Sequence, residues 1–584
     1  MYILVTGSPS ERIRVQELDS AGAAAGLDRR LTTPEFLALL REREHDVVRW
    51  VWADTARIYP VVLRGNVRVA RCHDLRLCHV ILRNSALTGG SVLANAPASR
   101  WDTPAAPAAE PAAVGATLFE MDLGAAQYDG TGHDGAGSLP DDALAEFQAQ
   151  LTAIRTCVEP GRLRLLLAAE SVGALIAAEM QFAGLPWRSA IHDRLLTAEL
   201  GPRVAAGIRP ARLEELAAGI RAELGDQTVN PDSPPELLKA LNRAGLRVAS
   251  TRAWELEKLD HPVIEPLLRY KKLSRLLAAN GWHWMESWII DDRFHPEYLP
   301  GGVVTGRWAT RGGGALQLPR QIRGAVVADP GWSFVVADAA QLEPRILAAL
   351  SSDAAMAAAG RGTDLYAGIV ASGVVETRAH AKVAMLGAMY GATSGESGRL
   401  LPRLARVYPR ALAFTETAAR AGERGDVVST RLGRSSPRPG LGWQDDQARA
   451  SEAGATAADE RRARSQARDW GRFTRNFIVQ GSAAEWALCW MAEIRKGLTA
   501  LSASVPATGT AVQGLTTRGE FEVAPHLVFF LHDEVIVHTP AALADDVARI
   551  VTEAAGAAGR LLFGDFPVDF PLTCVVVDSY ADAK

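Results

Sequence analysis

The spacing of apolar and polar residues changes along the chain, and each change predicts where strands give way to helices. Near the amino terminus, apolar residues alternate or cluster in MYILVTG, RIRVQEL and DVVRWVW, which predicts three short strands. TPEFLALLRERE has the spacing of an amphipathic helix. The first ninety residues are therefore expected to form a small α/β unit.

Helical periodicity dominates from Asp141 to about Ala279, with DDALAEFQAQLTAI and RLRLLLAAESVGALIAAEMQFAG as the clearest stretches. Ser233 stands before two prolines and predicts a helix N-terminus. Residues 96–140 are rich in Ala, Pro and Gly, which predicts a poorly ordered insertion. Residues 441–470 are polar and charged, and we expect a solvated helix and loop there.

The period changes within a single stretch, WSFVVADAAQLEPRILAAL. Residues 333–337 predict a short apolar strand, and LEPRILAAL predicts a helix that tolerates Pro344 in its first turn. Asp338 is thus expected at a strand end, where its carboxylate can project into a cleft. Taken alone, Asp338 is more simply interpreted as a helix N-cap.

A second acidic group lies between two apolar runs in HLVFFLHDEVIVHTP. Two strands are predicted, with His532, Asp533 and Glu534 at the tip of the hairpin between them. Surface turns are often polar, so this segment alone does not identify a site. However, apolar strands on both sides indicate a buried sheet, and acids at its end need a partner such as a metal ion.

The segment TRAHAKVAMLGAMYGAT predicts a helix with an unusual stripe. Arg378, Lys382, Leu386 and Tyr390 recur every four residues and therefore share one face. Two cations followed by an apolar and an aromatic residue suit an anionic ligand with a flat apolar end. The alternative is a basic amphipathic surface helix.

Composition narrows the class of protein. The chain has 584 residues, of which 48% are hydrophobic and 22% charged, as in ordinary globular proteins of several domains. The net charge of −4 excludes a strongly basic chain but leaves room for a local basic cleft. Five scattered cysteines, no signal peptide and no long apolar run predict a soluble, cytoplasmic protein without a membrane span.

In this order and spacing, DAAQLEPR, RAHAKVAMLGAMYG and HDE resemble motifs A, B and C of the family A DNA polymerases. Thr305-Gly306-Arg307, Leu316-Gln317 and Arg472…Asn476…Gln480-Gly481, the last expected before an apolar helix, agree with that family. The resemblance covers roughly residues 165–584. It implies a multidomain α/β (α+β) fold shaped as a right hand, with palm, fingers and thumb, that binds primer–template DNA and deoxynucleoside triphosphates as a monomer.

The resemblance also implies a metal site. In this family two carboxylates hold two Mg²⁺ ions, which Mn²⁺ can replace, and Asp338 and Asp533 stand where those ligands are expected. The main-chain carbonyl of Ala339 would complete the set, and Glu534 would be an accessory acid. Hard oxygen ligands of this kind suit Mg²⁺ and a two-metal phosphoryl transfer.

Roles for other residues follow from the resemblance in the same way. The residues expected at the nucleotide are the phosphate-gripping Arg378 and Lys382, the steric gate Glu343, and Leu386, Tyr390 and Gln341. The residues expected at the DNA are Arg307, Gln317, Arg345, Arg472, Asn476, Gln480 and His532. Of these, Gln341 and Arg345 are also expected to support the site.

Four positions depart from the family pattern. Ala339-Ala340 replaces an aromatic-Ser pair, Pro344 replaces an aliphatic residue beside the gate, and Leu386 stands where Phe or Tyr is usual. These changes concern the choice of nucleotide sugar. They remove neither a predicted metal ligand nor a predicted phosphate cation, so an active polymerase is expected.

The amino-terminal unit resembles a degenerate, ribonuclease H-like 3′–5′ exonuclease domain. The first strand lacks an Asp-x-Glu pair, Asp74 is the one acid that matches, and no Tyr-x-x-x-Asp is found near Asp141. A lone carboxylate cannot hold two divalent ions, so no proofreading is expected. The layout is similar to actinobacterial bifunctional 3′–5′ exonuclease/DNA polymerases without the 5′ nuclease domain.

The resemblance predicts five segments: exonuclease-like 1–165, thumb 166–289, palm 290–350, fingers 351–494 and palm 495–584. Repair or replication in the bacterial cytoplasm, beside the nucleoid, is the expected setting. Two alternatives remain at this stage. One is a single-subunit RNA polymerase-like enzyme, which Glu343 disfavours, and the other is a catalytically silent DNA-binding protein of the same fold.

Overall fold

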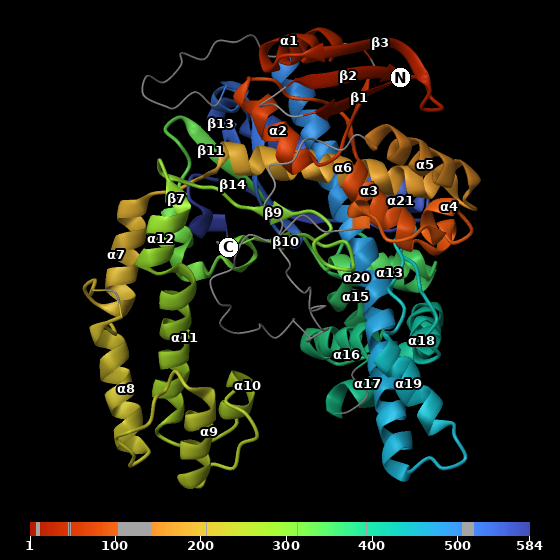
Figure 1. Cartoon of the computed structure of the whole chain (residues 1–584). Coiled ribbons are helices and arrows are strands. Elements are labelled where there is room, and N and C mark those ends of the chain that lie inside the picture. Colours follow the sequence, from red (N-terminus) through yellow and green to blue (C-terminus); the bar gives the residue numbers. More distant parts are fainter. Residues whose placement is uncertain are drawn as a thin grey trace.

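The computed structural model describes residues 1–7, 12–44, 46, 48–102, 142–205, 207–311, 314–391, 395–504 and 519–583. They form an amino-terminal unit, a central sheet and two helical arms that extend from it (Figure 1). Most of the predicted 96–140 insertion lies outside the described residues. Within those ranges, no helix combines the length and the apolar character needed to cross a bilayer.

The amino-terminal unit is built on a five-stranded sheet in the order β3-β2-β1-β4-β5. Strands β1 to β3 are antiparallel, whereas β4 and β5 run parallel to β1. The three predicted strands are confirmed, but β3 was not predicted, because its AAGLDRRL sequence is exposed and has no apolar alternation. The elements are β1 Tyr2–Gly7, β2 Ile13–Leu18, β3 Ala24–Leu31, α1 Thr33–Arg43, β4 Arg49–Trp52, α2 Thr55–Arg64, β5 Cys72–Asp74, α3 Leu75–Asn84 and α5 Ala143–Thr156.

The central sheet is antiparallel, in the order β12-β13-β11-β14. Its strands consist mainly of apolar residues, and β11 and β13 are buried along most of their length, as the sequence predicted. Helix α21 packs against this sheet. The elements are β11 Trp332–Ala339, β12 His526–Leu531, β13 Glu534–Pro540, α21 Ala544–Phe563, β14 Leu572–Val577 and the short helix η7 Tyr580–Ala583.

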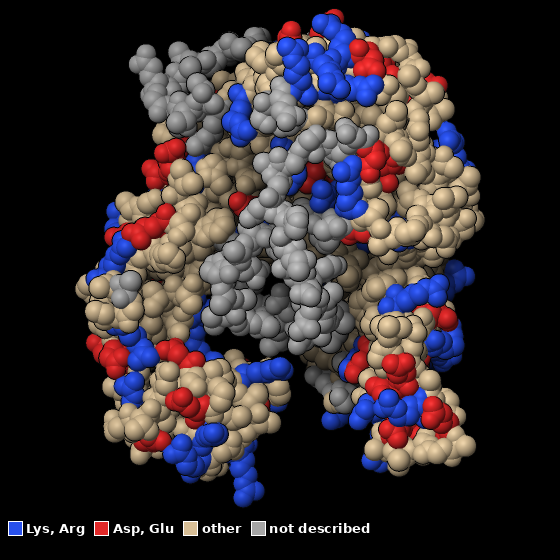
Figure 2. Space-filling view, viewed as in Figure 1, with Lys and Arg blue, Asp and Glu red and all other residues tan. Residues whose placement is uncertain are grey.

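Two helical arms extend from the sheet, and the space-filling view shows their far ends standing apart (Figure 2). One arm contains α7 Ser189–Leu200, α8 Ala211–Glu223, α9 Pro234–Arg243, α10 Ala253–Leu256, α11 Ile264–Asn280 and α12 Trp282–Trp288. The other contains α13 Leu342–Leu350, α14 Ala354–Ala359, α15 Leu365–Ala371, α16 Arg378–Tyr390, α17 Gly395–Val407, α18 Pro409–Glu423 and α19 Leu441–Ala450. Ser233 precedes α9, and α19 buries no side chain, as predicted.

Helices α6 (Pro160–Ala183) and α20 (Ala457–Ser504) connect these parts. The predicted boundary at 165/166 falls inside α6, and the one at 494/495 falls inside α20. Gln480-Gly481 was expected before a helix, but both residues lie within α20. Close packing explains why residue 481 is a glycine although it lies inside α20. A Cβ there would lie 2.4 Å from Thr430 Cγ2 and 3.1 Å from the carbonyl oxygen of Thr305.

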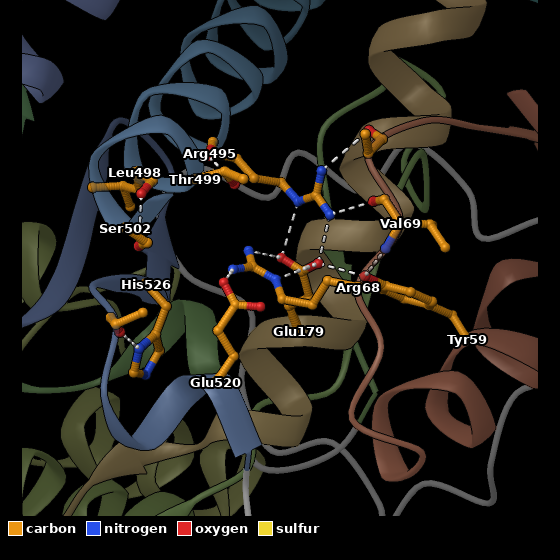
Figure 3. A network of polar contacts seen from close by, with 12 residues as sticks. Tyr59, Arg68, Val69, Glu179, Arg495, Leu498, Thr499, Ser502, Glu520 and His526 are labelled. Atoms are coloured by element: carbon orange, nitrogen blue, oxygen red, sulfur yellow. Dashed lines mark hydrogen bonds and ion pairs between the residues drawn. The ribbon is translucent and has the colours of Figure 1, made fainter. Parts of the chain in front are cut away.

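A buried polar network fastens the amino-terminal unit to α6 and α20 (Figure 3). The Glu179 carboxylate of α6 accepts hydrogen bonds from Arg495 Nη2 at 2.7 Å, Arg68 Nη2 at 3.0 Å and Tyr59 Oη at 2.6 Å. Arg495 Nη2 also donates to the Val69 carbonyl at 2.6 Å. Despite burial, the two arginines hold the pKa of Glu179 well below its ordinary value. An ion pair whose hydrogen bonds are satisfied on both sides resists separation of the parts.

Candidate active site

The two predicted metal-binding acids lie at one end of the central sheet. Asp338 is the penultimate residue of β11 and stands directly opposite Glu534 of β13. Asp533 lies in the turn between β12 and β13, and its carbonyl accepts a hydrogen bond from the Ala339 N–H at 2.9 Å. Both aspartates are half-buried. The ladder therefore brings motifs A and C together.

The backbone turns sharply at two positions beside these acids. His532 and Gln341 have φ values of 60° and 49°, in the left-handed region that non-glycine residues seldom adopt. At His532 this conformation reverses the chain between β12 and β13, and part of the side chain reaches solvent at the tip. Loss of hydration and the charge of Arg307 lower the pKa of His532. Its ring is thus biased toward the neutral form.

Glu534 differs from the two aspartates because it is buried, at 1% exposure. The Tyr580 hydroxyl of η7 donates a hydrogen bond to its carboxylate. Burial and the nearby Glu534 charge raise the pKa of Tyr580, so the phenol stays protonated. Tyr580 therefore fixes the Glu534 side chain, and the predicted accessory role of this acid remains a prediction.

Helix α16 presents the predicted stripe. Arg378 and Lys382 are exposed, whereas Leu386 and Tyr390 are half-buried, so the stripe runs from a solvated cationic end to an apolar end. Thr377 caps the helix by accepting a hydrogen bond from the His380 N–H at 3.1 Å. This gradient is the one expected for a ligand with phosphates at one end and a ring at the other.

Four predicted residues meet at the apolar end of the stripe. Glu343 of α13 accepts a hydrogen bond from Arg307 Nη2 at 2.8 Å and another from the Tyr390 hydroxyl. Burial, and then the Glu343 charge, raise the pKa of Tyr390, which also interacts with Gln480. Residues from α13, α16, α20 and the 301–307 loop thus converge here. The sequence could suggest this grouping only through the family resemblance.

A second cluster lies at the cationic end and includes a residue that the sequence did not identify. The Asp364 carboxylate accepts hydrogen bonds from Arg378 Nη2 at 2.8 Å and Gln341 Nε2 at 3.0 Å. Gln341 and Arg378 were predicted, but Asp364 carries no motif of its own. Its position before α15, as a helix N-cap, was the only available signal.

Arg345 is not placed where DNA could reach it, which corrects the prediction of a DNA contact. Its side chain is 1% exposed. The guanidinium donates to the carbonyls of Ala340 at 3.1 Å, Gly360 at 2.7 Å and Thr363 at 2.8 Å. Arg345 therefore braces the loop after motif A from inside the protein, which is the supporting role also expected of it.

The remaining predicted DNA contacts lie in different surroundings. Arg472 of α20 is exposed and pairs with Asp469. Asn476, one turn further, is 7% exposed, and its Oδ1 has no hydrogen-bond partner among the described residues. Gln317 ends a short 3₁₀-helix at Ala315–Gln317, and its side chain lies outside the described part. These three roles remain predictions.

The sheet end offers the chemistry of a hard-metal site. Asp338 and Asp533 supply carboxylates, and Ala339 adds a main-chain carbonyl nearby. Oxygen donors of this type fit Mg²⁺ or Mn²⁺ and do not fit a soft metal. In the described ranges, no group of three or more His, Cys, Asp or Glu side chains has the arrangement of a complete metal site.

Asp74, the acid of the amino-terminal unit, has a different role. It is 2% exposed, and its carboxylate accepts hydrogen bonds from the N–H groups of Thr55 at 2.7 Å and Leu77 at 3.0 Å. Burial and the neighbouring Asp54 raise its pKa to about 6. Asp74 thus caps α3 and ties it to the start of α2.

The right-hand fold, with two aspartates at the end of its central sheet, is typical of the nucleic-acid polymerase class. The family model for DNA polymerase family A matches residues 208–576, and the chain belongs to that family. The structure is similar to a solved one described as the "POL domain of Pol1 from M. smegmatis complex with DNA primer-template and dNTP". That match has a TM-score of 0.63 at 18% identity, over 100% of this chain and 95% of the other.

Curated relatives match over slightly more than half of the chain. DNA polymerase I of Chloroflexus aurantiacus is 26% identical over 359 residues, which are 55% of this chain and 33% of the relative. The thermostable DNA polymerase I of Thermus aquaticus is 23% identical over 366 residues, which are 56% of this chain and 37% of the relative. The matched region therefore spans about a third of the length of these relatives.

Proposed function

We propose that this chain is a template-directed DNA polymerase that adds deoxynucleotides to a primer 3′-hydroxyl. The observation that carries the proposal is the meeting of Asp338 and Asp533 at one sheet end, joined through the 2.9 Å Ala339–Asp533 hydrogen bond. Family membership and the exposed cations of α16 support the same reaction.

Asp338, Asp533 and the Ala339 carbonyl would hold two Mg²⁺ ions. The ions would supply Lewis-acid activation of the primer hydroxyl and of the triphosphate. The carboxylates of the chain would attract the ions, and ligands from DNA and nucleotide would complete their shells. Mn²⁺ has similar ligand preferences and would replace Mg²⁺.

The cationic end of α16 would bind the triphosphate through Arg378 and Lys382, whose charges match the charge that grows on the leaving phosphates. Leu386 and Tyr390 would face the sugar and the base. Glu343, fixed by Arg307 and Tyr390, would stand where a ribose 2′-hydroxyl must fit. A fixed carboxylate excludes that hydroxyl better than a mobile one does.

The DNA would be contacted by Arg307, Gln317, Arg472, Asn476, Gln480 and His532. The amino-terminal unit would not degrade DNA, and the capping bonds of Asp74 support that view. The enzyme would act as a monomer in the bacterial cytoplasm, in repair or replication.

Primer extension with each nucleotide in turn, with and without Mg²⁺, tests the proposal. We expect Mg²⁺-dependent addition of the deoxynucleotide that pairs with the template base. A preference for ribonucleotides would assign the chain to the RNA polymerase-like alternative. Tight duplex binding without any extension would identify a silent DNA-binding protein.

A further inference from the structure

Asp364 lies at the junction of two functional segments. It caps α15, because its Oδ1 accepts a hydrogen bond from the Ala367 N–H at 2.9 Å. Its Oδ2 accepts from Gln341 Nε2 at 3.0 Å and from Arg378 Nη2 at 2.8 Å and Nε at 3.3 Å. One carboxylate oxygen therefore joins the loop after Asp338 to the start of α16.

The same contacts orient the Arg378 guanidinium. Its Nε and Nη2 side faces Asp364, and the guanidinium carbon lies 5.4 Å from the centre of the Tyr366 ring. Nη1 makes no hydrogen bond with the described residues, and the side chain is 58% exposed. Arginine presents its donors in a rigid planar fork, so fixing one side aims the other.

We infer that Asp364 is a positioning residue that aims the open side of Arg378 at the incoming triphosphate and links this cation to the Asp338 segment through Gln341. The inference rests on the proposed polymerase function. It adds a residue outside the three motifs to the set that determines nucleotide affinity.

Geometry explains why a carboxylate can assist an anion-binding arginine. The carboxylate contacts the guanidinium through Nε and Nη2, so the cation lies between Asp364 and a phosphate bound at Nη1. Burial opposes ionisation, but the Arg378 and Ala367 hydrogen bonds keep the pKa of Asp364 below its ordinary value. Without Asp364, the long arginine side chain must be ordered by the nucleotide itself, which weakens binding.

Asp364→Ser separates positioning from capping, because serine is also a strong N-cap but carries no charge. Asp364→Asn keeps the shape as well as the cap. Asp353→Ser is the matched control, since Asp353 caps the neighbouring helix α14 through the Met356 N–H at 3.1 Å and holds the Ala411 N–H rather than an arginine side chain. Arg378→Ala and the double variant Asp364→Ser/Arg378→Ala complete a double-mutant cycle.

The measurement is the Kd of the matched deoxynucleoside triphosphate for the enzyme on a primer that ends in a 3′-deoxy residue, so that no chemistry follows. Asp364→Ser should raise this Kd about tenfold and Asp364→Asn by less, with primer–template Kd within about twofold of the wild type. In the Arg378→Ala background, Asp364→Ser should have no further effect. Asp353→Ser should lower thermal stability and leave nucleotide Kd unchanged.

Two results would overturn the inference. An unchanged or lower nucleotide Kd in Asp364→Ser would show that Asp364 does not aim Arg378, and additive effects in the cycle would show that the two residues act independently. If the wild type extends primers, only the inference fails in these cases. If the wild type neither extends primers nor binds nucleotide on the terminated primer, the proposed function and the inference fail together.

Discussion

Two regions of the molecule place aspartates at the ends of strands and use them in opposite ways. In the central sheet, Asp338 lies near the end of β11 with Asp533 beside it, and both are half-buried. In the amino-terminal sheet, Asp74 ends β5 but is 2% exposed. There, α3 begins at the next residue, and its Leu77 N–H donates to the carboxylate, as does the Thr55 N–H at the start of α2.

Asp338 and Asp74 differ in how many residues separate them from the next helix. After β11, Gln341 adopts a left-handed conformation, and α13 begins at Leu342, four residues after Asp338. The acid therefore stays on the ladder beside motif C. A strand-end aspartate is available for chemistry when the next helix is delayed, and it becomes a structural cap when the helix begins directly after it.

The largest expected effect is the loss of primer extension when Asp338 of the central sheet is replaced. Asp338→Ala should lower the primer-extension rate by more than about 1,000-fold, because it removes one of the two proposed metal-binding carboxylates. Primer–template Kd, measured by fluorescence anisotropy, should change by less than about threefold. An equal loss of binding and extension would contradict a metal-binding role.

For Asp74 of the amino-terminal sheet we expect the reverse: a loss of stability with little change in primer extension. Asp74→Ala should lower the free energy of unfolding of that unit by about 1–3 kcal/mol, because the Thr55 and Leu77 N–H groups lose their acceptor. Primer extension per folded molecule should stay within about twofold of the wild type. Thermal unfolding and extension assays check both. Digestion of single-stranded 3′ ends that disappears in Asp74→Ala would instead assign Asp74 to a nuclease site.

Glu534 is the intermediate case, because it lies in the central sheet but is buried like Asp74. Glu534→Gln keeps an acceptor for the Tyr580 hydroxyl and removes only the charge. We expect an extension rate reduced about tenfold, far less than for Asp338→Ala. Tyr580→Phe is the control, and it should lower thermal stability while changing the rate less than Glu534→Gln does. A Glu534→Gln rate equal to the wild type would make Glu534 purely structural.

The smallest effect concerns Glu485, a buried acid of α20. Burial raises its pKa to about 7, although Thr430 and the Leu432 N–H at 2.9 Å donate to it. A raised carboxyl pKa favours the folded state below about pH 4.5, and this contribution is lost as the pH rises through about 7. Between pH 5 and 8, the wild-type Tm should therefore fall by about 2–4 °C more than that of Glu485→Gln. If the Tm of the wild type and that of Glu485→Gln depend on pH in the same way, the raised pKa of Glu485 is contradicted.

The central features of the site could be predicted because they are local in the sequence. Unbroken apolar runs predicted β11 and the β12–β13 hairpin, and four-residue spacing predicted the stripe on α16. The position of each acid or cation could then be inferred from the predicted strand or helix that carries it. Asp364 could not be predicted, because its partners Gln341 and Arg378 lie on other elements and no periodicity links them.

Other errors have a similar cause. Arg345 is the last residue of motif A, and the resemblance implied a DNA contact, but carbonyls of the 360–363 segment surround its guanidinium. Gly481 suggested a helix boundary, whereas long-range packing against Thr430 explains it. The exposed strand β3 had no apolar signal at all. Contacts between segments that are distant in the sequence determine these features, and no local sequence pattern indicates such contacts.

The continuous helix α20 makes the amino-terminal unit mechanically relevant. Glu179 and Val69 hold α20 at Arg495. Gln480, which interacts with Tyr390, lies about 22 Å away along the same helix, at 1.5 Å per residue. A rocking of about 5° about Arg495 would displace Gln480 by about 2 Å, enough to break a hydrogen bond. The amino-terminal unit, for which we propose no nuclease activity, is therefore expected to limit rotation of α20 and with it the displacement of Gln480.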